Sequence, residues 1–139
     1  MTATVPTPVL TVSRPTVRPL VRCGLVAAVL ASVATPLVAA AGHGAGISLD
    51  MSGQPVPMYA FAQLTAFFSL VGLGLAVVLA RRAGSPRPTF LRTTVALTAL
   101  SLVPDAVVSA AVETKGLLML THLVAAAIVI PALASRLPE

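Results

Sequence analysis

Four long apolar stretches divide the chain, and the charged residues collect in the segments between them. The apolar stretches cover residues 23–41, 58–80, 90–112 and 116–135. At 1.5 Å per residue, about 20 helical residues cross the ~30 Å hydrocarbon core of a bilayer. Lipid offers the backbone no hydrogen-bond partners, so each crossing has to be a helix. The pattern predicts an all-α integral membrane bundle of four transmembrane helices, arranged as two antiparallel hairpins.

The segments between these stretches have the composition of tails and turns. Residues 1–22 are basic and rich in proline, which predicts a disordered tail ahead of a transmembrane domain at 23–139. Residues 42–57 contain four glycines and two prolines. A basic turn follows at 81–88, and residues 113–115 form a third, very short turn.

Basic residues are distributed unequally between the two sides of this bundle. With four crossings, the tail, the basic turn and the end of the chain share one side. That side holds eight of the nine basic residues: Arg14, Arg18, Arg22, Arg81, Arg82, Arg87, Arg92 and Arg136. The other side holds only Lys115. Because cytoplasmic loops are enriched in Lys and Arg, we expect both ends of the chain to be cytoplasmic.

The first apolar stretch also resembles a secretory signal peptide, since a basic segment precedes it and small residues follow at 39–42. However, the stretch is longer than the ~7–15 apolar residues of a signal peptide. We therefore expect residues 1–41 to be retained as a membrane helix, with cleavage near Gly42 as the alternative.

Composition excludes several classes of protein. The chain is 57% hydrophobic and 9% charged, whereas soluble domains carry roughly 25% charged residues. The net charge of +5 does not indicate nucleic-acid binding, because the arginines lie at the ends of apolar stretches and tryptophan is absent. Cys23 is the only cysteine, which excludes an intrachain disulfide and thiol–disulfide chemistry that needs a cysteine pair.

A stripe of polar residues runs along the third predicted helix. Its members recur at steps of four, three, four and four: Thr94, Thr98, Ser101, Asp105 and Ser109. Hydroxyl groups can bond to their own helix. The Asp105 carboxyl group cannot be accommodated so easily, because an acid at the centre of a membrane helix costs about 2.5–3.5 kcal/mol on insertion scales.

Two further polar residues fall at the level of Asp105. Counting from the turn at 113–115, Asp105 and His122 both lie about 10 Å below the outer surface. Gln63 on the second helix reaches a similar level. We therefore predict an intramembrane polar cluster of Asp105, His122 and Gln63. It is either a proton relay, an ion or substrate contact or part of a metal site, or a structural hydrogen bond that fixes helix register.

No catalytic residue, cofactor or metal is assigned from the sequence. One His and one Asp are too few for a closed metal site, which normally has three or four protein ligands. His43 and Asp50 could add ligands, but their spacing does not require it. A bis-histidine haem needs two membrane histidines, and one chain supplies only His122.

Small residues on the first two helices mark faces where helices can approach closely. They recur at helical spacing as Ala27, Ala31 and Thr35, and as Thr65, Ser69, Gly72 and Ala76. Packing within the bundle is the favoured interpretation, and a homodimer contact is the alternative.

Residues 90–105 and 121–133 resemble a family of small four-helix bacterial membrane proteins catalogued only as a domain of unknown function. The His-Leu-Val-Ala-Ala run that begins at His122 is the most recognisable part. The resemblance implies the four-helix fold and a bacterial cytoplasmic membrane, and it implies no activity.

We therefore expect a non-enzymatic binding or accessory protein in the lipid bilayer, with a second copy or another membrane protein as partner. The alternative is a small transporter or channel subunit that uses Asp105 and His122. Small multidrug exporters have this size, but they use an acid in the first helix, where this chain has none.

Overall fold

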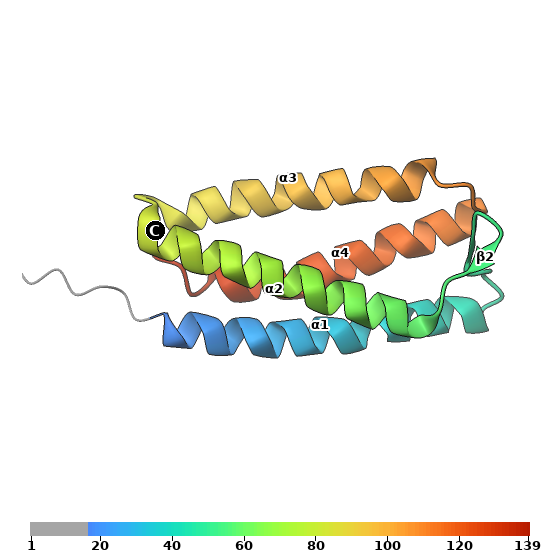
Figure 1. The fold of residues 1–139 in the computed structure, drawn as a ribbon, viewed down its shortest axis with the longest axis horizontal. Coiled ribbons are helices and arrows are strands. Elements are labelled where there is room, and N and C mark those ends of the chain that lie inside the picture. Colours follow the sequence, from blue (N-terminus) through green and yellow to red (C-terminus); the bar gives the residue numbers. More distant parts are fainter. Residues whose placement is uncertain (1–16) are drawn as a thin grey trace, which may run out of the picture.

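Four helices form almost the whole structure, a computed structural model that describes residues 17–139 (Figure 1). The helices are α1 Arg18–Gly44, α2 Met58–Arg82, α3 Pro86–Val107 and α4 Val112–Ala134. A small hairpin of β1 Asp50–Met51 and β2 Gln54–Pro55 joins α1 to α2. Each helix is long and apolar enough to cross a membrane. The predicted all-α membrane bundle is confirmed.

The helices run alternately up and down, so the start of α1 and the end of the chain lie at the same end of the bundle (Figure 1). We call it the terminal end, and the opposite end the hairpin end. Helix α1 packs along α2 and α4, whereas α3 packs on α4 and α2 at the other side of the bundle (Figure 1). Many large apolar side chains remain exposed along all four helices, as expected where lipid covers them.

Small residues allow α1 to lie very close to its neighbours. Ala27, Ala31 and Thr35, predicted as one packing face, are all buried in α1. The hydroxyl of Thr35 lies 2.9 Å from that of Thr65, so the small-residue faces of α1 and α2 meet there. These faces thus serve packing within the chain, and the homodimer stays a prediction.

Helix α1 is longer than predicted at both ends. It begins at Arg18, so the last residues of the predicted tail are helical, while residues 1–16 lie outside the described part. Pro19 does not prevent this, because the first helical N–H groups have no partner within the helix and proline is favoured there. The helix also continues past Pro36 to Gly44.

The third helix is displaced toward the N-terminus relative to its prediction. Pro86 and Pro88, which fall in the predicted turn at 81–88, lie in the first turn of α3, where a missing N–H costs nothing. The helix ends at Val107, one turn after Pro104, and residues 108–111 lead into α4.

The predicted turn at 113–115 is instead the first turn of α4. Glu113 lies where a negative charge is favoured by the helix dipole. The Lys115 ammonium group donates a hydrogen bond to the Ala106 carbonyl at the end of α3, 3.0 Å away. These charges mark the start of one helix and the end of another, which explains why they resembled a loop.

The β-hairpin is tied to the connection between α3 and α4. Ser52 and Gly53 at its tip both have positive φ angles, 52° and 77°, as a two-residue hairpin turn requires. The Ser52 N–H donates to the Ser109 carbonyl at 2.8 Å, and the Thr114 hydroxyl donates to the Ser48 carbonyl at 2.7 Å. Ser109 was predicted on the polar stripe of the third helix, but it lies in this connection because α3 ends early.

Candidate functional site: an apolar cavity with a carboxylate–imidazole pair

A cavity of about 370 Å³ lies between α2, α3 and α4. Met51 and Val56 of the hairpin region line it at one end, and Phe90 lines it toward the terminal end. Its lining is mostly apolar. Four lining side chains of α2 and α3 are more than half exposed: Leu64, Phe68, Val71 and Leu97. The cavity therefore reaches the apolar surface of the bundle between α2 and α3.

The polar face of α3 points into this cavity. Thr94, Thr98, Ser101 and Asp105 all line it, as does Thr121 of α4. Most of these hydroxyls bond to their own helix. Thr94 donates to the Phe90 carbonyl at 2.8 Å, Ser101 to the Thr98 carbonyl at 2.7 Å and Thr121 to the Leu118 carbonyl at 2.7 Å. Such bonds are inexpensive in a membrane helix and need no ligand.

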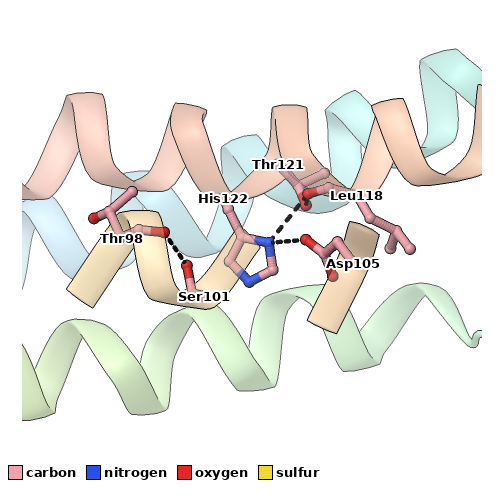
Figure 2. A network of polar contacts seen from close by, with 6 residues as sticks. All are labelled: Thr98, Ser101, Asp105, Leu118, Thr121 and His122. Atoms are coloured by element: carbon pink, nitrogen blue, oxygen red, sulfur yellow. Dashed lines mark hydrogen bonds and ion pairs between the residues drawn. The ribbon is translucent and has the colours of Figure 1, made fainter. Parts of the chain in front are cut away.

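Asp105 and His122 meet across the cavity wall (Figure 2). The Nδ1 atom of His122 lies 2.7 Å from Oδ2 of Asp105 and 3.2 Å from the Leu118 carbonyl oxygen, one turn earlier on α4. The Asp105 side chain is 9% exposed and the His122 side chain 41%. The structure thus brings together two residues of the predicted cluster, with the acid buried and the imidazole accessible.

The two contacts of Nδ1 differ in geometry. The contact with the Leu118 carbonyl has hydrogen-bond geometry, whereas Oδ2 of Asp105 is close to Nδ1 but accepts no well-aligned hydrogen bond from residues 17–139. Both neighbours of Nδ1 are oxygen atoms, and a backbone carbonyl can only accept. The ring hydrogen is therefore on Nδ1, and the short contact with Asp105 is electrostatic rather than a second hydrogen bond.

The pair lies at a similar level on α3 and α4. His122 is ten residues from the start of α4 at Val112, or about 15 Å along the helix, and seven residues, or about 10 Å, from Lys115. Helix α3 reaches the same level although Asp105 is only two residues from its end, because residues 108–111 continue toward the hairpin end without helical structure.

Gln63 does not join the pair. Its side chain is exposed, and it is not among the residues that line the cavity. The sequence contains a signal for this: Gln63 precedes Thr65 by two residues, or about 200° around the helix, so it faces away from the small-residue stripe. Gln63 was therefore chosen for its depth along the helix, without regard to the direction in which its side chain faces around the helix.

The other candidate ligands lie elsewhere. His43 Nδ1 contacts the Ile47 carbonyl at 3.2 Å, and Asp50 accepts a hydrogen bond from Ser48 at 2.9 Å. Within residues 17–139, no three His, Cys, Asp or Glu side chains are grouped as a metal site would need.

Sequence reasoning missed the α4 face of the cavity. Besides the predicted His122, this face consists of Leu118, Thr121, Ala125, Val129 and Ile130. The spacing of three or four residues around His122 places them on one side of a helix, so extending the pattern from His122 could have found them. Met51 and Val56 had no comparable signal, because their position depends on the hairpin.

Searches of curated proteins and of solved structures give no match to this chain. A family model, in contrast, matches residues 15–139, which include both stretches that carried the sequence resemblance. This match spans nearly the whole chain, which therefore belongs to DUF6069, a family of unknown function.

Proposed function

We propose that this multi-pass membrane protein is a non-enzymatic binding protein that holds a small apolar molecule in the cavity between α2, α3 and α4. The observation that carries the proposal is the combination of an apolar cavity with a buried Asp105 and an accessible His122. A volume of about 370 Å³ falls in the ~300–1,000 Å³ range of small-molecule sites. Few polar groups in a mostly apolar lining are also typical of such sites.

The polar pair argues for a ligand rather than a lipid chain. A polar group facing hydrocarbon without a partner costs several kcal/mol, roughly 4–8 for transfer of an amide or hydroxyl from water to alkane. An acyl chain offers His122 no hydrogen bond. An apolar molecule that carries one polar group can pack against the apolar lining and form a hydrogen bond with the His122 ring.

Access to the cavity is from the side of the bundle. The exposed lining residues Leu64, Phe68 and Leu97 belong to the surface that faces lipid. At the hairpin end, Met51 and Val56 line the cavity, and the Ser52–Ser109 hydrogen bond holds the hairpin over the α3–α4 connection. We therefore infer that the ligand enters from the bilayer between α2 and α3.

Gly72→Leu is expected to abolish saturable binding of para-octylanisole, an ether that lacks a hydrogen-bond donor. Gly72 lines the cavity, and a Cβ there meets no atom of the described chain within 4 Å, so the leucine has room to begin extending into the space that the ether would occupy. Binding is measured in lipid nanodiscs from the changes in protein methyl NMR signals, at equal mole fractions of the ether in the bilayer.

Gly74→Leu is the matched control for this experiment. Gly74 lies two residues further along α2, is exposed, and also has no atom of the described chain within 4 Å of an added Cβ. It is not a lining residue, so this variant should bind the ether like the unsubstituted protein. Non-saturable signals in the unsubstituted protein, or equal binding by the two leucine variants, would refute the proposed function.

A second candidate is a transporter or channel subunit. The contact between Asp105 and His122 on two membrane-spanning helices favours it, because intramembrane acid and histidine residues often form proton relays. Proton uptake coupled to a solute gradient in proteoliposomes distinguishes a transporter from a binding protein.

We further propose a bacterial cytoplasmic membrane location with the terminal end in the cytoplasm, on the strength of the eight-to-one distribution of basic residues. In a Cys23→Ser background, Gln54→Cys should react with an impermeant thiol reagent added to intact cells, and Ser85→Cys should not. Gln54 is exposed in the hairpin and avoids the positive φ of Ser52, while Ser85 is exposed between α2 and α3. The opposite labelling pattern would reverse the orientation.

A further inference from the structure

We infer that the polar end of the ligand is a neutral hydroxyl group that donates a hydrogen bond to Nε2 of His122. This inference rests on the proposed function and narrows it to lipophilic alcohols and phenols. The ring is the reachable part of the pair, because 41% of the His122 side chain is exposed, whereas Oδ2 of Asp105 is inaccessible.

The tautomer of His122 determines what the cavity can accept. The ring hydrogen is on Nδ1, between the Leu118 carbonyl at 3.2 Å and Oδ2 of Asp105 at 2.7 Å. When the ring is neutral, one of its nitrogens is a donor and the other an acceptor, so Nε2 is then the acceptor. Figure 2 shows Nε2 on the side of the ring turned away from Asp105 and toward α2, across the cavity.

Three of the hydroxyl groups that line the cavity already donate hydrogen bonds within their own helices. Thr94, Ser101 and Thr121 each donate to a carbonyl of their own helix. The Lys115 ammonium group, on the same helix as His122, donates to the Ala106 carbonyl. Nε2 of His122 accepts no hydrogen bond from residues 17–139, so a donor group on the ligand can supply one.

A neutral donor fits better than a cation. Among residues 17–139, Asp105 is the only acid that lines the cavity, and its Oδ2 is buried, so an ammonium ion would lack direct contact with that oxygen. Moving a charge to the middle of the membrane costs several kcal/mol more than moving a hydroxyl group. Asp105 acts as a positioning residue, because its nearby charge favours the ring hydrogen on Nδ1.

The test compares para-octylphenol with para-octylanisole, which have nearly the same apolar body but differ in the hydroxyl hydrogen. The unsubstituted protein should bind the phenol about three- to tenfold more tightly, as a net hydrogen bond predicts. His122→Phe should make the two affinities equal. His43→Phe, which replaces the other histidine outside this cavity, should preserve the preference.

A spectroscopic measurement keeps the test valid if His122→Phe fails to fold. In a His43→Gln background, ¹⁵N-labelled histidine reports on His122 alone, because the chain has two histidines. At alkaline pH, the spectrum should show a protonated Nδ1 and an unprotonated Nε2, and the phenol but not the ether should shift Nε2. Asp105→Leu, which removes the nearby negative charge, should populate the Nε2–H tautomer.

The outcomes separate this inference from the proposed function. Equal affinity for phenol and ether, with both abolished by Gly72→Leu, would overturn the inference and leave the binding function in place. A free protein with Nε2 protonated would also overturn it. If neither compound binds in a way that Gly72→Leu abolishes, both the inference and the proposed function are refuted.

Discussion

Asp105→Ala and His122→Ala should each lower the free energy of unfolding in detergent by about 1–3 kcal/mol, because each substitution leaves a partner without its contact in a low-dielectric interior. The effect exceeds the ~0.6 kcal/mol average of neutral hydrogen bonds in membrane proteins. Most of this loss of free energy comes from the Asp105 carboxylate, because its side chain is only 9% exposed and Nδ1 of His122 lies 2.7 Å from Oδ2.

The double variant should lose less free energy of unfolding than the two single variants lose in sum. A coupling above about 0.5 kcal/mol in a double-mutant cycle indicates that the two side chains interact. Thr98→Ala provides the control, because Thr98 lines the same cavity on α3 but its hydroxyl makes no hydrogen bond within the described residues. The effects of Thr98→Ala and His122→Ala on the free energy of unfolding should be additive. If Asp105 and His122 also add within ~0.3–0.5 kcal/mol, the pair does not act as a unit.

Gly24→Leu should destabilise the bundle by about 1–3 kcal/mol through overpacking. A Cβ at Gly24 lies 2.6 Å from a methyl group of Leu73 and 2.8 Å from one of Leu133. Both leucines are buried, so neither can move aside without displacing α2 or α4. Without a hydrophobic driving force between helices in lipid, close backbone packing is a main source of their association.

Gly74→Leu makes the same chemical change at an exposed position of α2. Replacing a helical glycine by leucine there should raise helix stability, since glycine is about 1 kcal/mol less favourable than alanine in a helix. Thermal unfolding in detergent should therefore place Gly24→Leu below the unsubstituted protein and Gly74→Leu at or above it. Equal unfolding temperatures for the two variants would mean that α1 does not pack against α2 and α4 at Gly24.

The number and type of helices followed from the sequence because the bilayer imposes both a length and a hydrogen-bonding rule. Helix boundaries were less accessible, because hydropathy does not distinguish an apolar helix end from an apolar connection. The predicted third helix extended through residues 108–112 for this reason, although Pro104 ends α3 one turn later at Val107. Pro86 was assigned to the turn at 81–88, although proline also begins helices.

The site was predictable in part. Asp105 and His122 were matched by depth on neighbouring helices, and the structure places them in contact. Gln63 passed the same depth criterion but faces outward, because an apolar helix gives little information about its rotation. The cavity itself depends on the separation of α2 from α3, and that separation arises from side-chain packing that a single sequence does not specify.

The central claim is that the cavity holds a small molecule taken from the membrane. The most direct measurement is mass spectrometry of organic extracts from protein purified in mild detergent from its native membrane. We expect one hydroxylated lipophilic compound, near one equivalent per chain, with the unsubstituted protein and with Gly74→Leu, and its loss with Gly72→Leu. Extracts that contain only bulk membrane lipids, in the same proportions for all three proteins, would contradict the account.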